Sequence, residues 1–291
     1  MEKIKFVTDS ASDITLDEEK RYGIRVINYK ITLGNKGYVS RIDVSNREFY
    51  DLLERNSELP KTSQIYVYEF LELYEELYND GYTHVILTLI NKEATATVSN
   101  AEAAAEAFYS DHPDARKFMQ IKIIDSRTYS CGYSYPIIEA VKMADRGVRF
   151  DEIVIYLENW LRHVVIYFAP YTLKYAKKSG RIPSALAVTG EALGIKPVMR
   201  IYNGRIETSG TVRGEKKIIQ KLVEIADKEI IRGTPYVTGC GQNYEDILTL
   251  NRELTMKIGY PPAKSLDLGP IITAHAGPKA LGFAIQSKLT K

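Results

Sequence analysis

Short apolar segments alternate with helix-like segments through the first half of the chain, and this alternation constrains the fold more than any other feature. Apolar segments that read as strands are residues 3–8, 23–31, 83–90 and 122–125. Helices are expected at residues 45–55, 68–79, 98–109 and 136–146. Strand–helix alternation of this kind predicts an α/β fold whose parallel sheet carries helices on both faces.

The second half has a different pattern. Asn203-Gly204 stands between the apolar segments 196–202 and 205–209, which predicts a β-hairpin. A helix is expected at residues 215–229, and strands at 235–240, 270–275 and 282–286. A length of 291 residues suits two domains. We therefore expect an N-terminal α/β domain over residues 1–155 and a C-terminal α/β domain with a mixed sheet over residues 156–291.

Composition excludes several classes of protein. The chain has 39 basic and 37 acidic residues, so its net charge of +2 argues against a dedicated nucleic-acid binder. Cys131 and Cys240 are its two cysteines, which suits a reducing compartment better than a disulfide scaffold. The N-terminus does not read as a signal peptide, and no apolar run reaches the length of a membrane span. We expect a cytoplasmic protein.

Small polar side chains follow the predicted strands at the edge where α/β sheets bind ligands. They are Thr8, Asp9, Ser10, Thr62, Ser63, Asn91, Thr95, Thr97, Asp125 and Ser126. Such residues are also the favoured helix caps, so each is open to a structural or a ligand-binding interpretation. Together, hydroxyl groups beside a helix N-terminus suit a small anion such as a carboxylate. No phosphate-binding glycine motif, nucleophile elbow or metal-ligand spacing occurs, so neither a cofactor nor a metal is expected.

Two further features are open to either a structural or a functional interpretation. His275 follows an apolar segment that reads as a strand, and a lone histidine is more often structural than functional. Tyrosine is abundant, with 21 residues, and is densest at residues 129–135. These rings suit half-buried packing or the wall of a pocket.

Several short motifs in order carry a resemblance to a known family. They are VTDSASDI near the start, TSQ at 62–64, KKSGRI at 177–182, ALGIKPVMRIYNGRI at 192–206, Arg213 in TVRGEKK, and HAGPKALG near the end. In this order and spacing the chain resembles the DegV family, the fatty-acid-binding proteins that serve a bacterial fatty acid kinase. The resemblance runs from about residue 3 to residue 286.

The resemblance implies a two-domain α/β fold that holds one fatty acid and a set of residues that contact it. Thr62, Thr95 and His275 would meet the head carboxylate, with Ser63 and Asn91 in the same site. Arg181 would face the kinase. The chain departs from the family pattern at Ile65, Asn91, Lys92 and Ala96 and in the tyrosines Tyr129, Tyr133 and Tyr135. These departures predict an acyl tunnel that is shorter or more polar than usual.

The sequence therefore predicts a carrier without catalytic machinery of its own. It would bind a long-chain fatty acid, contact membranes transiently, and present the carboxylate to a fatty acid kinase catalytic subunit. An alternative is a binding protein or enzyme for a smaller carboxylate or polar metabolite, using Asp9, Asp125 and His275. A third is a non-catalytic regulator that acts through Arg181 and neighbouring basic residues.

Overall fold

The first half of the chain builds a parallel sheet. The computed structural model describes residues 2–180 and 194–290. Its first sheet has the strand order β2-β1-β6-β7 and is parallel throughout. These strands are β1 (Ile4–Asp9), β2 (Arg25–Ile27), β6 (His84–Leu89) and β7 (Gln120–Asp125). The parallel sheet predicted for this half is confirmed.

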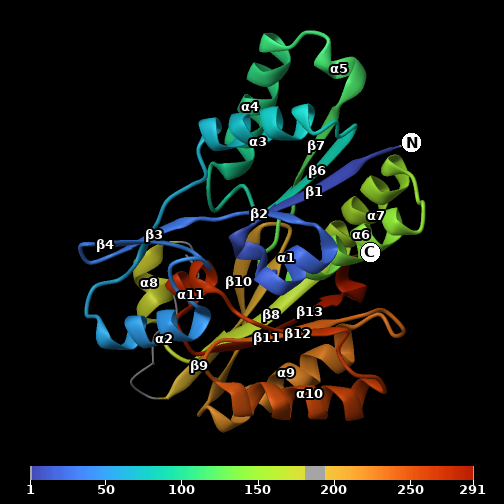
Figure 1. The fold of residues 1–291 in the computed structure, drawn as a ribbon. Coiled ribbons are helices and arrows are strands. Elements are labelled where there is room, and N and C mark those ends of the chain that lie inside the picture. Colours follow the sequence, from blue (N-terminus) through green and yellow to red (C-terminus); the bar gives the residue numbers. More distant parts are fainter. Residues whose placement is uncertain (1, 181–193, 291) are drawn as a thin grey trace.

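Helices cover this sheet on both sides. Figure 1 shows α3 (Val67–Asn79) and α4 (Thr97–Asp111) on one side, and α6 (Ser134–Asp145) and α7 (Phe150–His163) on the other. Two further helices of this half are α1 (Leu16–Tyr22) and α5 (Ala115–Phe118). The expected boundary near residue 155 falls inside α7, so the division at that residue stays a prediction.

The predicted strand at residues 23–31 is wrong as a single element. Its first part is β2, but its end belongs to β3 (Lys30–Leu33), which lies in a separate antiparallel sheet. Between them the backbone N–H of Tyr29 donates to Ser10 Oγ at 3.0 Å, so it does not pair with a strand. The small sheet has the order β4-β3-β5, with β4 (Lys36–Val39) and β5 (Lys61–Thr62), and α2 (Asn46–Arg55) lies between these strands in sequence.

The second half forms a mixed sheet, as expected. Its strand order is β10-β9-β8-β13-β11-β12, in which β11 and β12 are parallel and the other pairs antiparallel. The strands are β8 (Val164–Pro170), β9 (Ile195–Tyr202), β10 (Arg205–Arg213), β11 (Val237–Cys240), β12 (Lys264–Asp267) and β13 (Ala280–Gln286). The predicted hairpin is confirmed, because Tyr202 pairs with Arg205 across a turn in which Asn203 and Gly204 have positive φ.

The predicted strand at residues 270–275 is wrong, because this segment is the helix α11 (Pro270–Ala276). Pro270 opens the helix at a position where its missing N–H costs nothing, and Gly277 ends it with a φ of 89°. A short apolar run does not distinguish a strand from a buried helix. The remaining α-helices of the described residues are α8 (Lys174–Ser179), α9 (Lys216–Glu229) and α10 (Tyr244–Ile258).

The mixed sheet divides the core into two layers. Side chains such as Val165, Leu281 and Phe283 form one cluster with residues of α9 and α10. Val237 and Ile166, on the opposite face, join the large cluster that includes the parallel sheet. Figure 1 shows α9 and α10 on the side of the mixed sheet away from the parallel sheet. The space between the two sheets is therefore enclosed by apolar residues of both halves.

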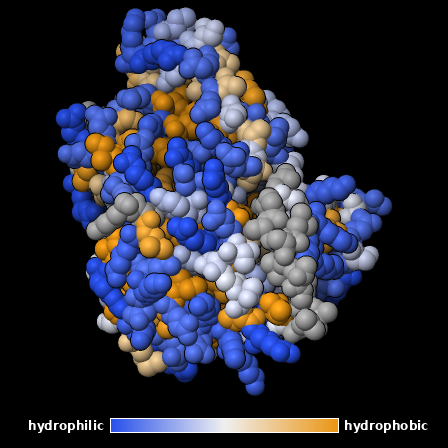
Figure 2. Space-filling model, turned by 180° about the vertical axis from the view of Figure 1, so that it is seen from behind, coloured by the Kyte–Doolittle hydropathy of each residue, from blue (hydrophilic) through white to orange (hydrophobic). Residues whose placement is uncertain are grey.

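The surface hydrophobic residues on one face of the molecule lie in several separate groups. Figure 2 shows small hydrophobic groups separated by hydrophilic residues on the face that it displays. Of the helices that the structure describes, none combines the length and the apolar character that crossing a bilayer requires.

Candidate ligand-binding cavity

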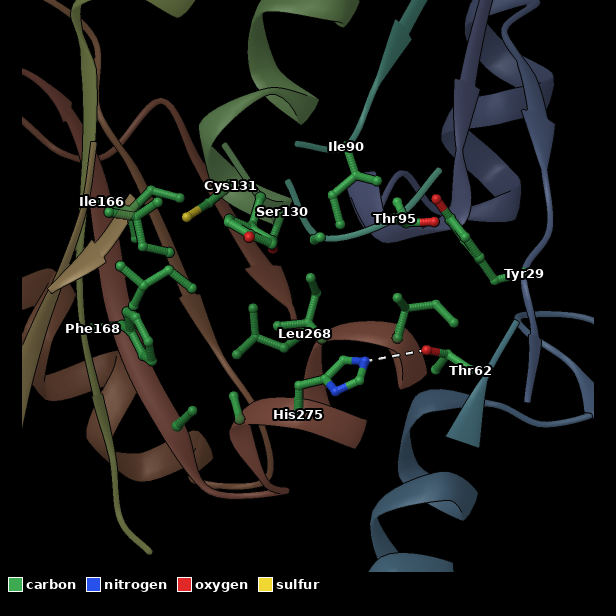
Figure 3. Close-up of a pocket in the computed structure, with 18 of the residues that line it drawn as sticks. Tyr29, Thr62, Ile90, Thr95, Ser130, Cys131, Ile166, Phe168, Leu268 and His275 are labelled. Carbon is green, nitrogen blue, oxygen red and sulfur yellow. Dashed lines mark hydrogen bonds between the residues drawn. The ribbon is translucent and has the colours of Figure 1, made fainter. Parts of the chain in front are cut away.

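A cavity of about 400 Å³ lies between the parallel sheet and the mixed sheet. Its volume is within the range of about 300–1,000 Å³ that is typical of small-molecule sites. Residues from both halves of the chain line it, including four of the five predicted carboxylate-binding residues: Thr62, Ser63, Thr95 and His275. Figure 3 shows Thr62, Thr95 and His275 around one side of the cavity, and Ile166 and Phe168 on the other.

Thr62 and His275 meet across the polar side of the cavity. Thr62 Oγ1 and His275 Nε2 are 3.2 Å apart, although 213 residues separate them in sequence. Thr62 ends β5 and is paired with Ile31 of β3, while His275 lies on α11. Together a hydroxyl and an imidazole provide the hydrogen-bonding groups that a carboxylate needs.

The polar segment Thr62–Gln64 does not cap α3. That helix begins at Val67, and its N-cap residue, Tyr66, makes no side-chain cap hydrogen bond. The backbone N–H of Ser63 donates to the Lys30 carbonyl at 3.0 Å, which extends the link between this segment and β3. Thr62, Ser63 and Gln64 all line the cavity instead. Of the two interpretations of this segment, the geometry favours contact with a ligand.

A chain of hydroxyl groups supports Thr95. Its Oγ1 lies 3.0 Å from Thr97 Oγ1, and Tyr29 Oη donates to the same Thr97 oxygen at 2.9 Å. Thr97 is fully buried and begins α4, so it fixes both neighbours at the start of that helix. Burial and the nearby Asp9 raise the pKa of Tyr29 well above its usual value, so this phenol stays a neutral hydrogen-bond donor.

Asn91 is the predicted carboxylate-binding residue that does not line the cavity. It is buried, and its Nδ2 donates to Tyr129 Oη at 3.0 Å and to the Gly204 carbonyl at 2.9 Å. Tyr129 does line the cavity, so Asn91 orients a wall residue from behind. Arg181 lies outside the residues that the structure describes.

Two buried aspartates lie behind the cavity wall. Asp9 accepts hydrogen bonds from the Ile90 backbone N–H and from Tyr133 Oη, both at 2.7 Å. Asp13 accepts from Ser130 Oγ at 2.5 Å and from the Gly269 backbone N–H at 2.9 Å. Burial raises the pKa of Asp9 to about 6 and that of Asp13 to about 7. Through its hydrogen bond to Gly269, Asp13 joins the N-terminal half to the segment that leads into α11.

Asp13 and Ser130, which contact each other, both have an unusual backbone conformation. Both are non-glycine residues with positive φ, 58° and 43°. Such conformations cost on the order of 1–3 kcal/mol and persist only where the surroundings hold them. Here the hydrogen bond between the two side chains holds both, and it places Ser130 and the neighbouring Cys131 in the cavity wall.

The far side of the cavity is apolar. Ile166, Phe168, Ile201 and Ile206 come from the mixed sheet, and Leu268 precedes α11. Of the tyrosines predicted to narrow the tunnel, Tyr129 lines the cavity, whereas Tyr133 bonds to Asp9 and Tyr135 packs against Trp160. Only one of these three rings therefore reaches the cavity wall.

Within residues 2–180 and 194–290, no cluster of three or more His, Cys, Asp or Glu side chains could hold a metal ion. Cys131 and Cys240 are both buried free thiols, and burial raises the pKa of each to about 12. Of the residues proposed for an enzymatic alternative, His275 lines the cavity. Asp9 lies behind the wall, and Asp125 accepts from the backbone N–H groups of Lys92 and Arg127.

Sequence reasoning missed Tyr29, Leu268 and Ser130 as cavity residues. Tyr29 fell inside a segment that was expected to be a continuous strand. A signal for it existed in Asn28, a residue that often interrupts strands. No local pattern predicts Leu268 or Ser130, because each reaches the cavity through contacts with residues far away in the chain.

The fold and the site define an α/β protein that encloses an apolar cavity with polar groups at one side. The family model described as "Uncharacterised protein, DegV family" matches residues 3–288. The chain belongs to the DegV family. A DegV domain-containing protein of Clostridium acetobutylicum is 32% identical to it over 295 residues, which cover 99% of this chain and 100% of that protein.

Solved structures of the family share this fold. One is described as "Fatty Acid Binding of a DegV family Protein from Thermus thermophilus"; it is 27% identical, has a TM-score of 0.84, and the match covers 98% of this chain and 99% of that one. Another is DegV, a fatty acid binding protein from Bacillus subtilis, which is 26% identical with a TM-score of 0.81 and the same coverage of both chains.

Proposed function

We propose that this protein binds a long-chain fatty acid in the cavity between its two sheets. The carboxylate lies at Thr62 and His275, with the Thr95 hydroxyl and Ser63 nearby, and the tail extends toward Phe168. The observation that carries this proposal is the division of one cavity into a polar side and an apolar side. Two relatives whose descriptions name fatty acid binding, from Thermus thermophilus and Bacillus subtilis, support it.

The energetics assign different roles to the two sides. Burying a methylene group contributes about 0.8 kcal/mol, so a long acyl chain supplies on the order of 10 kcal/mol before the costs of association. The tail therefore provides most of the affinity. The hydroxyl groups and the imidazole fix the position and direction of the carboxylate. Their hydrogen bonds replace those that the carboxylate made with water, so they add less to the affinity than the tail does.

Direct identification of the ligand tests this proposal. The purified protein is extracted with organic solvent, the extract is analysed by mass spectrometry, and the delipidated protein is titrated with fatty acids and with their methyl esters. We expect a bound long-chain acid, and tighter binding of the acid than of the ester. An empty extract with no binding at any chain length contradicts the proposal, and saturation by short carboxylates or polar metabolites alone favours the smaller-ligand alternative.

We further propose that the protein acts in the cytoplasm as a carrier without its own catalytic machinery. It exchanges fatty acid through transient membrane contact and presents the carboxylate to a separate fatty acid kinase. A carboxylate oxygen would attack the γ-phosphorus of ATP on the kinase, giving an acyl phosphate and ADP. The family resemblance in the KKSGRI motif supports this part of the proposal and assigns Arg181 to the kinase contact.

A reconstituted reaction tests the carrier role. Loaded protein, a bacterial fatty acid kinase and ATP are expected to yield acyl phosphate, and Arg181→Ala is expected to slow its formation without weakening fatty acid binding. Arg213→Ala is the matched control. Equal rates of acyl phosphate formation for the parent and Arg181→Ala contradict the role of Arg181. If the kinase forms no acyl phosphate from the loaded protein, the proposal that the protein presents its fatty acid to a kinase is contradicted.

A further inference from the structure

Two glycines face each other on central strands of the mixed sheet. Gly239 of β11 pairs directly with Gly282 of β13, and both line the cavity. Val237 and Ala280, two residues from each of them along their strands, belong to the core between the sheets. Because alternate residues of a strand share a face, the glycines also face this core. Glycine weakens a strand interior and often marks close approach of a ligand or backbone.

The two glycines differ in what a side chain would meet. A Cβ at Gly282 would lie 2.4 Å from the Tyr167 carbonyl oxygen and 2.7 Å from Phe168 Cβ, so packing of the strands requires glycine there. The three atoms nearest to a Cβ at Gly239 would be side-chain carbons of Leu266 and Leu268, the closest being Leu266 Cδ1 at 3.1 Å. The ends of leucine side chains can move. Strand packing therefore accounts for Gly282, but it does not account for Gly239.

Gly239 also lies in the sheet that forms the apolar side of the cavity. Gly282 pairs with Gly239 on one side and with Phe168 on the other, so the three residues form one row across the sheet. Figure 3 shows Phe168 on the side of the cavity opposite Thr62. Leu268, whose Cδ2 would lie 3.5 Å from a Cβ at position 239, lines the cavity itself.

We propose that Gly239 determines the length of acyl chain that the cavity accepts, an inference that rests on the proposed function. The missing side chain leaves room for the end of the tail beside Leu268. A larger residue there fills this room and presses on Leu266 and Leu268. The protein then excludes terminal methylenes of a long chain and still accepts a shorter one with the same carboxylate contacts.

A chain-length series on Gly239→Ala and Gly239→Val tests this inference. Delipidated proteins are titrated with saturated acids of 10 to 18 carbons, and the acids that co-purify with each protein are identified by mass spectrometry. Each excluded methylene costs about fourfold in affinity. We therefore expect Gly239→Val to bind the 18-carbon acid at least about tenfold more weakly than the parent, with the 10- and 12-carbon acids bound within about twofold. Gly239→Ala should show a smaller shift in the same direction.

Gly210→Ala is the matched control, because Gly210 lies in β10 of the same sheet, outside the cavity, and a Cβ there would meet only Lys221 Cε at 3.9 Å. Its chain-length profile should match that of the parent. Thermal unfolding of each variant distinguishes a changed cavity from a misfolded chain, since loss of fold weakens all acids equally. An unchanged profile in folded Gly239→Val overturns this inference alone, whereas absence of binding by the parent overturns the proposed function.

Discussion

At the residue scale, the contact between Thr62 and His275 is the centre of the proposed carboxylate site. Their side chains are 3.2 Å apart at the polar side of the cavity. Replacing Thr62 with valine keeps the shape of the side chain but removes its hydroxyl. Because a hydrogen bond to a charged group contributes about 1.5 kcal/mol or more, we expect Thr62→Val to weaken fatty acid binding about tenfold. Displacement of a fluorescent fatty acid measures the change.

Thr32→Val is the control for this substitution. Thr32 lies in β3 beside β5, pairs with Lys61, and is exposed outside the cavity. It should leave the dissociation constant unchanged. Equal affinities of the Thr62→Val and Thr32→Val variants would show that the Thr62 hydroxyl does not contact the carboxylate.

Asp13 makes folding sensitive to pH. Burial raises its pKa to about 7, against the opposing effects of its hydrogen bonds and of Lys264, and Asp9 adds to the rise. Between about pH 4 and pH 7 the folded protein keeps a proton that the unfolded chain has released. The stability that this proton provides is complete at low pH and is lost as the pH rises toward 7.

Asp13→Asn should remove this contribution. We expect the free energy of unfolding of the parent, relative to that of the variant, to fall with rising pH by up to about 1.4 kcal/mol per pH unit and to level off above pH 7. For Asp9→Asn the fall should end near pH 6, since the pKa of Asp9 is raised to about 6. Urea unfolding at a series of pH values measures both. Parallel stability curves for parent and variants would contradict the assignment.

At the scale of elements, side chains of α2 form hydrogen bonds to the segment that leads into α11. Tyr50 Oη donates to the Leu268 carbonyl at 2.5 Å, and Asn46 Nδ2 donates to the Asp267 carbonyl at 3.2 Å. The next residue of that segment is held by the hydrogen bond from the Gly269 N–H to Asp13. These bonds between the two halves place His275 against Thr62, although neither Tyr50 nor Asn46 lines the cavity.

Removing the Tyr50 hydroxyl tests this arrangement. Tyr50→Phe leaves the buried Leu268 carbonyl without that donor, so we expect a loss of about 1–3 kcal/mol in the free energy of unfolding, measured with urea. Tyr68→Phe, at an exposed tyrosine of α3, should change stability by less than about 0.5 kcal/mol. If the two variants lose the same amount, the bond to Leu268 does not stabilise the fold.

At the scale of the whole molecule, the cavity exists because two sheets from different halves of the chain pack around it. A ligand there contacts both halves and binds the folded state alone. A free fatty acid at 100 times its dissociation constant should stabilise the delipidated protein by about 2.7 kcal/mol. We expect a rise of several degrees in the thermal midpoint, with a smaller rise for the methyl ester. A midpoint that does not change with added acid would contradict binding between the sheets.

The sequence by itself determined the α/β class, the parallel sheet of the first half, the mixed sheet of the second and the hairpin at Asn203-Gly204. These features depend on local periodicity and turn chemistry, which neighbouring residues carry. It also pointed to Thr62, Ser63, Thr95 and His275 through the order of short motifs, and all four line one cavity. The predictions of a strand at residues 270–275 and of one continuous strand at residues 23–31 were wrong, because short apolar runs fit more than one structure.

Only the tertiary structure decided which of these residues meet. Thr62 and His275 are 213 residues apart in sequence, and Asn91, which the motifs placed in the site, instead bonds to Tyr129 and Gly204 behind the wall. The tertiary fold likewise placed Gly239 on the cavity face, where the nearest neighbours of an added Cβ are leucine side chains. The physical reason is that a cavity is formed by packing between distant segments, and no local pattern encodes the space that remains between them.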